Sequence, residues 1–294
     1  MQSPKTSTYK VRGLELAYHC WGEAKNPSLV FFHGYLDHGL SFTPLAQQLS
    51  DDYHLIALDF RGHGHSGWVG DGGYYHFYDY YHDVIQLFRH LNLDSAHIVG
   101  HSMGGSIACT LAAMRPELIK SLILIEGLGP PSESLGDALL RLQRWQKSLS
   151  KEKVDGDVEH RRRARSQMDS VEEAAQRLQR TNPRLQQERA LDLAQTFTEK
   201  IDAGYFWRFD PLHQTPAAKP FRLEEIKEVW KEVKLPVLSL IGEESPFRLP
   251  DLEERHAIFQ NIVMAFIPEA GHNIHHEQPD ALIEKIRAWH QQQP

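Results

Sequence analysis

The sequence has only two cysteines, Cys20 and Cys109, among its 294 residues. Two cysteines cannot form the disulfide framework that holds small secreted domains together. Cys20 ends a strand-like run and Cys109 lies in a run of small residues, so we expect both to be buried thiols. This usage fits a reducing compartment, and we expect a cytoplasmic protein.

Long apolar runs and a strong excess of positive charge are also lacking. The longest apolar run, around residues 122–125, is far shorter than the roughly 20 residues that cross a bilayer. Met1–Lys5 is not followed by an apolar stretch, so we expect neither a secretory signal nor a membrane span. The formal net charge of −7 and the absence of a glycine-rich phosphate loop argue against nucleic acids and nucleotides as partners.

What the chain does contain is an alternation of strand-like and helical segments. Short apolar runs predict strands at residues 14–20, 29–32, 55–58, 96–100 and 122–125, and the segments between several of them predict helices at 41–49, 84–91 and 103–114. This alternation is typical of an α/β fold with a mostly parallel central sheet that helices cover on both faces.

The pattern changes after Gly129-Pro130-Pro131 and resumes with strands at 237–241 and 262–267 and a final helix at 281–290. We expect an α/β core formed by residues 1–130 and 233–294, interrupted by a helical insertion at 131–232 without a clear strand. Within it, the apolar spacing of Leu135, Leu139, Leu142 and Trp145 favours packing against the core. The basic run His160–Arg165 favours a solvated helix face over a binding patch.

One turn carries a candidate nucleophile. Gly100-His101-Ser102-Met103-Gly104 is followed at once by Gly105, with a predicted strand before it and a predicted helix after it. A serine exposed on a sharp strand-to-helix turn needs glycines beside it so that the neighbouring backbones can approach closely. The helix N-terminus also favours negative charge that develops there. A merely structural glycine-rich turn is the less favoured interpretation.

Together with three further motifs, this turn resembles the α/β-hydrolase superfamily. The motifs are His33-Gly34-Tyr35-Leu36-Asp37, the run Asp59-Phe60-Arg61-Gly62-His63-Gly64-His65-Ser66, and Gly271-His272. Leu124–Pro130 is similar to bacterial members of the serine-hydrolase-like or esterase-like kind. The resemblance implies that the insertion is a cap and that Ser102 is the nucleophile. Because haloalkane dehalogenases and epoxide hydrolases use an aspartate there, it excludes their chemistry.

The general base must be chosen among eighteen histidines. The resemblance implies His272, which follows the last predicted strand. His275 and His276 are more simply interpreted as a helix start or a solvated rim. A metal cluster formed by the histidines at 63, 65 or 272–276 is not expected, because these loops lack Cys or carboxylate ligands at zinc spacing. We therefore expect no metal and no other cofactor.

The acid departs from the usual family pattern. Most members carry an Asp after the penultimate strand, and this chain reads Gly242-Glu243-Glu244-Ser245 there. The alternative family position follows the strand after the nucleophile helix, and Glu126 occupies it. We favour Glu126 over Glu243 or Glu244, while a strand-end salt bridge remains open for Glu126.

The resemblance also implies an oxyanion hole made by the backbone N–H groups of Tyr35 and Met103. Leu128, Phe206 and Trp207 are candidate pocket residues, although packing of the cap on the core is the favoured interpretation of such aromatic residues. The expected function is a serine hydrolase that cleaves carboxylic esters with apolar or aromatic groups, as a monomer or homodimer. The same residues leave open C–C bond, thioester or amide hydrolysis, perhydrolysis, and a non-catalytic ligand-binding role.

Overall fold

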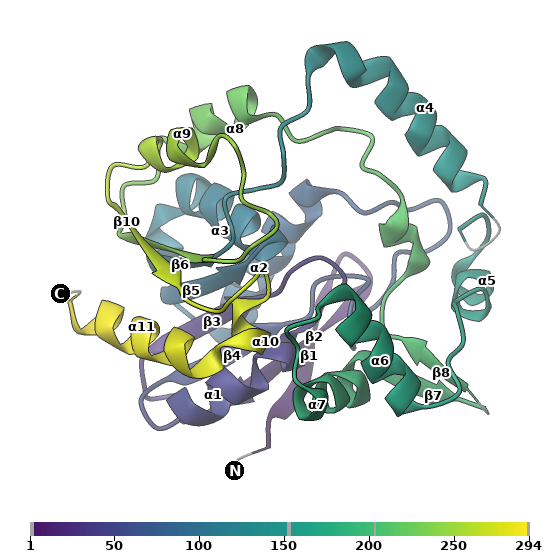
Figure 1. Ribbon diagram of the computed structural model, residues 1–294, viewed down its shortest axis with the longest axis horizontal. Coiled ribbons are helices and arrows are strands. Elements are labelled where there is room, and N and C mark those ends of the chain that lie inside the picture. The colour runs from purple at the N-terminus through teal and green to yellow at the C-terminus, as the bar shows by residue number, and fades with distance from the viewer. Residues whose placement is uncertain (1–2, 152–153, 203, 293–294) are drawn as a thin grey trace.

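The computed structural model describes residues 3–151, 154–202 and 204–292. Its centre is an eight-stranded sheet (Figure 1). In spatial order the strands are β1 (Lys5–Val11), β2 (Leu14–Trp21), β4 (His54–Leu58), β3 (Ser28–Phe32), β5 (Ala96–His101), β6 (Ile119–Ile125), β9 (Val237–Gly242) and β10 (Ile262–Ile267). The pairs β1–β2 and β2–β4 are antiparallel and all other pairs are parallel, which confirms the predicted fold class.

Helices cover both faces of this sheet. Each face of the sheet carries a large cluster of buried apolar side chains. Among the helices that contribute to these clusters, α1 (Thr43–Leu49) and α11 (Pro279–Gln291) lie on one face, and α2 (Phe77–Leu91), α3 (Met103–Met114) and α8 (Leu223–Trp230) lie on the other. The central strands are apolar on both sides because neighbouring residues alternate between the two clusters: Val30 and Phe32 pack with α2 and α3, and Phe31 packs with α1. Cys109 is buried as predicted, whereas Cys20 is only partly buried.

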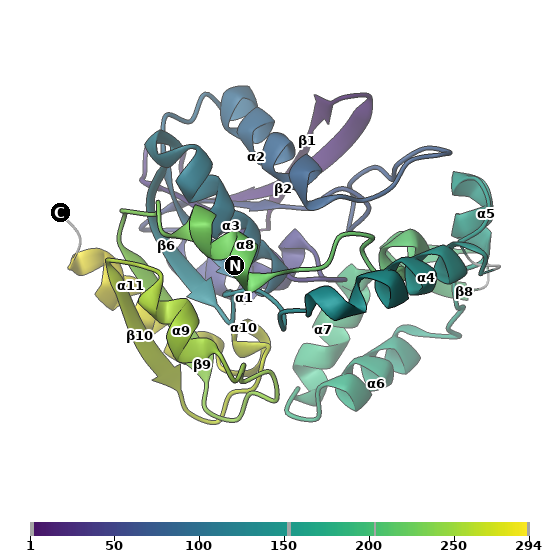
Figure 2. The same ribbon diagram turned by 90° about the horizontal axis from the view of Figure 1, so that it is seen from above.

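The inserted region lies to one side of the core (Figure 2). It consists of α4 (Ala138–Leu149), α5 (Val158–Arg163), α6 (Val171–Thr181), α7 (Gln187–Phe197), β7 (Thr198–Ile201) and β8 (Gly204–Trp207). The expectation of no strand here is wrong, because β7 and β8 pair as a short antiparallel hairpin. The predicted division at residues 232 and 233 stays a prediction, although α8 packs with the core: Trp230 is fully buried and its Nε1–H donates to Thr110 at 3.2 Å.

Two expectations about the insertion's surface are wrong. The leucines of this stretch do not pack on the core: Leu135, just before α4, is 76% exposed, and Leu139 of α4 is 68% exposed. Figure 1 shows this helix set apart from the sheet. The basic run at 160–165 is not wholly solvated, because Arg161 is buried and pairs with the buried Asp210 at 2.9 Å. In the described part of the chain, no helix is both long and apolar enough to cross a membrane.

Candidate active site

The turn that carries Ser102 connects β5 to α3, as the sequence predicts. Ser102 adopts φ +48°, a left-handed conformation that side chains other than glycine rarely take. The glycines are required by close backbone contacts: a Cβ at Gly100 would lie 2.7 Å from the Cα of Gly105, and one at Gly104 would lie 2.3 Å from the carbonyl oxygen of Phe32. The surrounding chain therefore stabilises a strained turn, and the serine is displayed at the carboxyl edge of the sheet.

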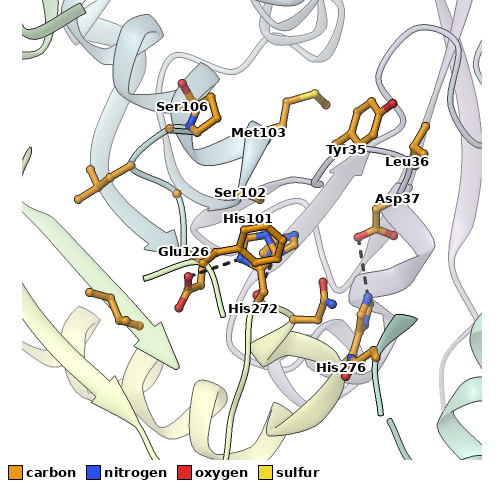
Figure 3. A pocket seen from close by; sticks show the side chains of 18 of the residues that line it. Tyr35, Leu36, Asp37, His101, Ser102, Met103, Ser106, Glu126, His272 and His276 are labelled. Atoms are coloured by element: carbon orange, nitrogen blue, oxygen red, sulfur yellow. Dashed lines mark hydrogen bonds and ion pairs between the residues drawn. The ribbon is translucent and has the colours of Figure 1, made fainter. Parts of the chain in front are cut away.

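Glu126 is the carboxylate that the structure brings to His272. It follows β6 directly, and its Oε2 lies 3.5 Å from Nδ1 of His272 (Figure 3). The same carboxylate accepts a 2.8 Å hydrogen bond from the Gly242 N–H on Oε1 and a 2.9 Å bond from Ser245 Oγ on Oε2. Its side chain is buried, so these contacts replace the water that a charged group would otherwise keep.

The other two candidate acids lie elsewhere. Glu243 and Glu244 are both exposed, and Glu244 forms an ion pair with Arg184. Ser245, which stands where most of the superfamily has an aspartate, is buried and directs its hydroxyl to Glu126. The departure from the usual pattern therefore places a hydrogen-bond donor, not a second acid, beside the carboxylate. In the sequence, Ser245 is recognised only as the position where the usual Asp is missing. Nothing in the sequence indicates the hydrogen bond from Ser245 to Glu126.

A histidine-rich network supports the two loops around Ser102. His101 donates from Nε2 to the backbone carbonyl of His272 at 3.0 Å, and so ties the loop of His272 to the turn of Ser102. His275 lies 3.3 Å from Asp37, which comes from the loop after β3. Burial lowers the pKa of His101 and of His275 well below the usual value, so both rings are neutral near neutral pH. The interpretation of His275 as a solvated rim is wrong, although it does belong to a short helix, α10 (Ile274–Glu277).

This network includes a group with the composition of a metal site. Ligand atoms of Asp37, His275 and His276 lie within 4.8 Å of one another, because the fold supplies the carboxylate that the sequence spacing lacked. The Asp37 oxygens, however, already accept hydrogen bonds from the His38 N–H and from a serine hydroxyl. The Arg189 guanidinium also lies 3.4 Å from Nδ1 of His276. The Arg189 charge and the hydrogen bonds that Asp37 already accepts favour a hydrogen-bond network over a metal ion at this position.

A second group, formed by His19, Asp59 and His65, is also satisfied internally. Asp59 accepts hydrogen bonds from the Gly39 and His65 backbone N–H groups at 2.6 and 2.8 Å, and it pairs with His19 at 3.1 Å. Burial raises the pKa of the Asp59 carboxyl, but the His19 and His65 side chains outweigh this effect and hold the pKa well below its usual value. The expectation that the protein needs no metal stays a prediction.

The two residues predicted to form an oxyanion hole come from two different segments: Tyr35 lies in the loop after β3, and Met103 lies at the start of α3. Met103 is the first residue of α3, and the first N–H groups of a helix have no partner inside it. Tyr35 follows Gly34, where a Cβ would lie 2.6 Å from the His101 ring, so the loop of Tyr35 runs close against the Ser102 turn. The Tyr35 hydroxyl donates to the carbonyl of His213 at 2.8 Å and thereby links this loop to the inserted region.

Ser102, Glu126 and His272 line one cavity of about 540 Å³. Most of its wall is apolar and comes from both the core and the insertion: Leu128, Ile241, Phe247, Leu249, Leu252, Leu178, Leu185, Leu193 and Phe197. Leu128, a predicted pocket residue, lines this cavity, and its role in substrate binding stays a prediction. The sequence analysis did not include the leucines of α6 and α7, which their helical spacing alone could have indicated.

The predictions for Phe206 and Trp207 are wrong. Both residues lie on β8 outside this cavity. The Phe206 ring lies 5.1 Å from the Arg165 guanidinium, and Trp207 packs against the insertion's own small core. Both rings therefore have a packing role, which is the interpretation favoured above for such aromatic residues.

Comparisons with known proteins agree with this architecture. The sequence model of the family described as "alpha/beta hydrolase fold" matches residues 27–279. A serine hydrolase-like protein of Danio rerio is 26% identical over 288 residues, which are 95% of this chain and 86% of the relative. Two solved structures are similar with a TM-score of 0.85. A hypothetical protein of Pseudomonas aeruginosa PAO1 is 26% identical (97% of this chain, 98% of that chain), and a thioesterase domain from the curacin biosynthetic pathway is 25% identical (98% and 100%).

Proposed function

The chain belongs to the α/β hydrolase family, and from that premise we propose that it hydrolyses carboxylic esters through Ser102, His272 and Glu126. The observation that carries the proposal is the pairing of Glu126 with Nδ1 of His272 in the same cavity as Ser102. A histidine held through Nδ1 presents Nε2 as the atom that can take a proton from a serine.

In the proposed reaction, His272 Nε2 removes the proton of the Ser102 hydroxyl while Oγ attacks the ester carbonyl carbon. The carbonyl oxygen becomes an oxyanion, which the backbone N–H groups of Tyr35 and Met103 stabilise. The imidazolium then returns its proton to the departing alcohol oxygen, and an acyl-Ser102 ester remains. Water, activated by the same imidazole, attacks this ester and releases the carboxylic acid and free Ser102.

Glu126 stabilises the imidazolium that forms in each step and fixes which ring nitrogen carries the proton. The Gly242 N–H and the Ser245 hydroxyl both donate to this carboxylate and limit its rotation. These contacts argue against a vestigial site. The Gly242 N–H and the Ser245 hydroxyl already satisfy a carboxylate at the end of a strand, and the His272 imidazole 3.5 Å away is an additional contact that a triad requires.

The cavity supports an apolar substrate. The leucine and phenylalanine side chains that form most of the wall stabilise hydrocarbon groups. We propose that the insertion at 131–232 acts as a cap, because α6, α7 and the loop between them supply four of the apolar side chains that line the cavity of Ser102.

Hydrolysis of p-nitrophenyl esters over a series of acyl lengths tests the proposal, with Ser102→Ala as the inactive variant. A fluorophosphonate label, located by mass spectrometry, should modify Ser102. Labelling should persist in Ser106→Ala and in Ser239→Ala, which each remove one of the two other serines among the described residues that line the cavity. Labelling of Ser102 without cleavage of any ester would favour a thioester, amide or C–C bond as the substrate. A folded protein that is neither labelled nor active would favour a ligand-binding role.

A further inference from the structure

A second cavity, of about 160 Å³, adjoins the large one. The two cavities share three wall residues, Tyr35, Phe77 and Met103. Two of these are the residues whose backbone N–H groups form the proposed oxyanion hole. A carbonyl group bound there would therefore have one cavity on each side, and a substituent on either side of the carbonyl could be accommodated.

The wall of the second cavity consists mainly of aromatic rings, and the polar atoms of two of them, Tyr75 and His213, are engaged elsewhere. The Tyr75 hydroxyl donates to Asp210 at 2.9 Å and accepts from the Val69 N–H at 3.1 Å. The His213 ring stacks on Tyr75 with centroids 3.7 Å apart, and its Nε2 donates to the Arg61 carbonyl at 3.1 Å. The polar groups of these rings thus point into the protein, which leaves their carbon surfaces to contact a ligand.

The wall also lacks formal charge. None of the described residues that line this cavity is a Lys, Arg, Asp or Glu. Burial lowers the pKa of His213 to about 3, so its ring is neutral at physiological pH. We call this space the aromatic cavity; it offers a charged group no counter-ion and stabilises a flat apolar group by ring contacts.

The volume limits the occupant to a single ring. A cavity of about 150 Å³ with an apolar wall is known to bind one benzene molecule, and the aromatic cavity has about 160 Å³. The cavity opens to solvent beside Tyr74 and Phe77, which are 40% and 39% exposed, so a naphthalene-sized group would leave part of its apolar surface in water.

The position of His272 decides which half of an ester enters. The departing alcohol oxygen must lie beside the imidazole that protonates it, so the alcohol half extends toward His272. Ser102 and His272 both line the large cavity, and neither is among the described residues that line the aromatic cavity. Figure 3 shows Tyr35 and Met103 on one side of Ser102 and His272 on the other. The acyl half therefore extends toward Tyr35 and Met103.

We propose that the aromatic cavity is the acyl subsite, and that it selects esters whose acyl half carries one uncharged six-membered ring, of phenylacetyl size. This inference rests on the proposed ester hydrolysis at Ser102. The large cavity then accommodates the alcohol half, which can be longer and aliphatic.

Two isomeric esters test the assignment: methyl phenylacetate carries the ring on the acyl half and benzyl acetate carries it on the alcohol half. Hydrolysis is followed by pH-stat titration in the wild type, in Ala218→Leu, which fills the aromatic cavity, and in the matched variant Thr181→Phe, which narrows the large cavity. Ala218→Leu should lower kcat/KM for methyl phenylacetate about tenfold or more and change that for benzyl acetate much less. Thr181→Phe should show the reverse preference.

The inference is overturned if Ala218→Leu affects benzyl acetate more, or both esters equally. Tyr74→Ala, which removes part of the same wall, gives a second test that does not depend on the folding of Ala218→Leu. It should raise kcat/KM for methyl 1-naphthylacetate relative to methyl phenylacetate, and an unchanged ratio would count against the cavity.

Binding of phenylacetamide, measured by calorimetry, separates this inference from the proposed function. If neither ester is cleaved but phenylacetamide binds and Ala218→Leu weakens the binding, ester hydrolysis is wrong and the ring-binding cavity stands without its role as an acyl subsite. If the esters are cleaved and Ala218→Leu changes neither phenylacetamide binding nor the preference between the isomers, ester hydrolysis stands and the acyl subsite is wrong.

Discussion

Lowering the pH from 7 to 5 is expected to destabilise the fold strongly, because several histidines are buried in the neutral form. His33 illustrates the cause: its Nε2 accepts a 2.9 Å hydrogen bond from the Phe60 N–H and its Nδ1–H donates to the Gly34 carbonyl at 2.7 Å. A second ring proton would break the first of these bonds and place a charge in a site without water. Burial accordingly lowers the pKa of His33 from 6.5 to about 4.

The magnitude follows from the difference between the folded and unfolded pKa values. A histidine whose pKa is depressed by folding stabilises the protein fully above about pH 6.5, and this contribution is lost as the pH falls toward the folded pKa. Burial also lowers the pKa of His38 to about 4 and that of His213 to about 3. Each of the three then loses about 2 kcal/mol between pH 7 and pH 5, roughly 6 kcal/mol together, which is comparable with the 5–15 kcal/mol of a typical domain.

Urea unfolding, followed by tryptophan fluorescence between pH 5 and 8, measures this loss. His38→Asn removes one titrating group and keeps its structural contact, because the amide oxygen can replace Nδ1 as the acceptor for the Leu40 N–H. This variant should lose about 2 kcal/mol less than the wild type over the same pH range. His82→Asn, at an exposed position, is the control and should follow the wild type. A wild-type free energy of unfolding that is equal at pH 5 and pH 7 would refute the reasoning.

Three further variants test the site and the attachment of the insertion. Glu126→Gln should lower kcat by roughly 10³–10⁴-fold at an unchanged melting temperature, because a neutral amide cannot stabilise the imidazolium; near-normal turnover would exclude Glu126 as the acid. Ser245→Ala removes one donor to that carboxylate and should lower kcat/KM about tenfold, since a hydrogen bond to a charged group contributes about 1.5–3 kcal/mol; full activity would show that the Gly242 N–H alone holds it. Asp210→Asn leaves the Arg161 charge buried without a counter-ion and should destabilise the protein by about 3–5 kcal/mol. An unchanged thermal unfolding curve would contradict this.

The core of the fold could be predicted because its signals are local. The strand over 96–100 and the helix that follows it are each specified by their own apolar residues, and the glycines around Ser102 stand together at positions 100, 104 and 105. The position of Glu126 could also be predicted, since it directly follows a buried strand. All of these features depend on residues that are neighbours in the sequence.

The predictions that were wrong depend on contacts between distant segments. Arg161 belongs to a run that is basic in sequence, yet it is buried because Asp210 reaches it from a loop beyond the hairpin. The leucines of α4 have the spacing of a packed helix, but spacing alone does not say whether a partner surface is present. The partnership of Asp37 with His275 joins residues 238 positions apart, and no local pattern predicts it.

Because β6 and β9 are paired, a carboxylate beside His272 can come from the residues that follow either strand. These strands are parallel neighbours, so the residues that follow them, Glu126 and Ser245, meet at one edge although they lie 119 positions apart in the sequence. A carboxylate on either strand would occupy nearly the same volume beside His272. An acid can therefore be transferred from one strand to the other by two single substitutions, through an intermediate with both carboxylates, without any change in the path of the backbone.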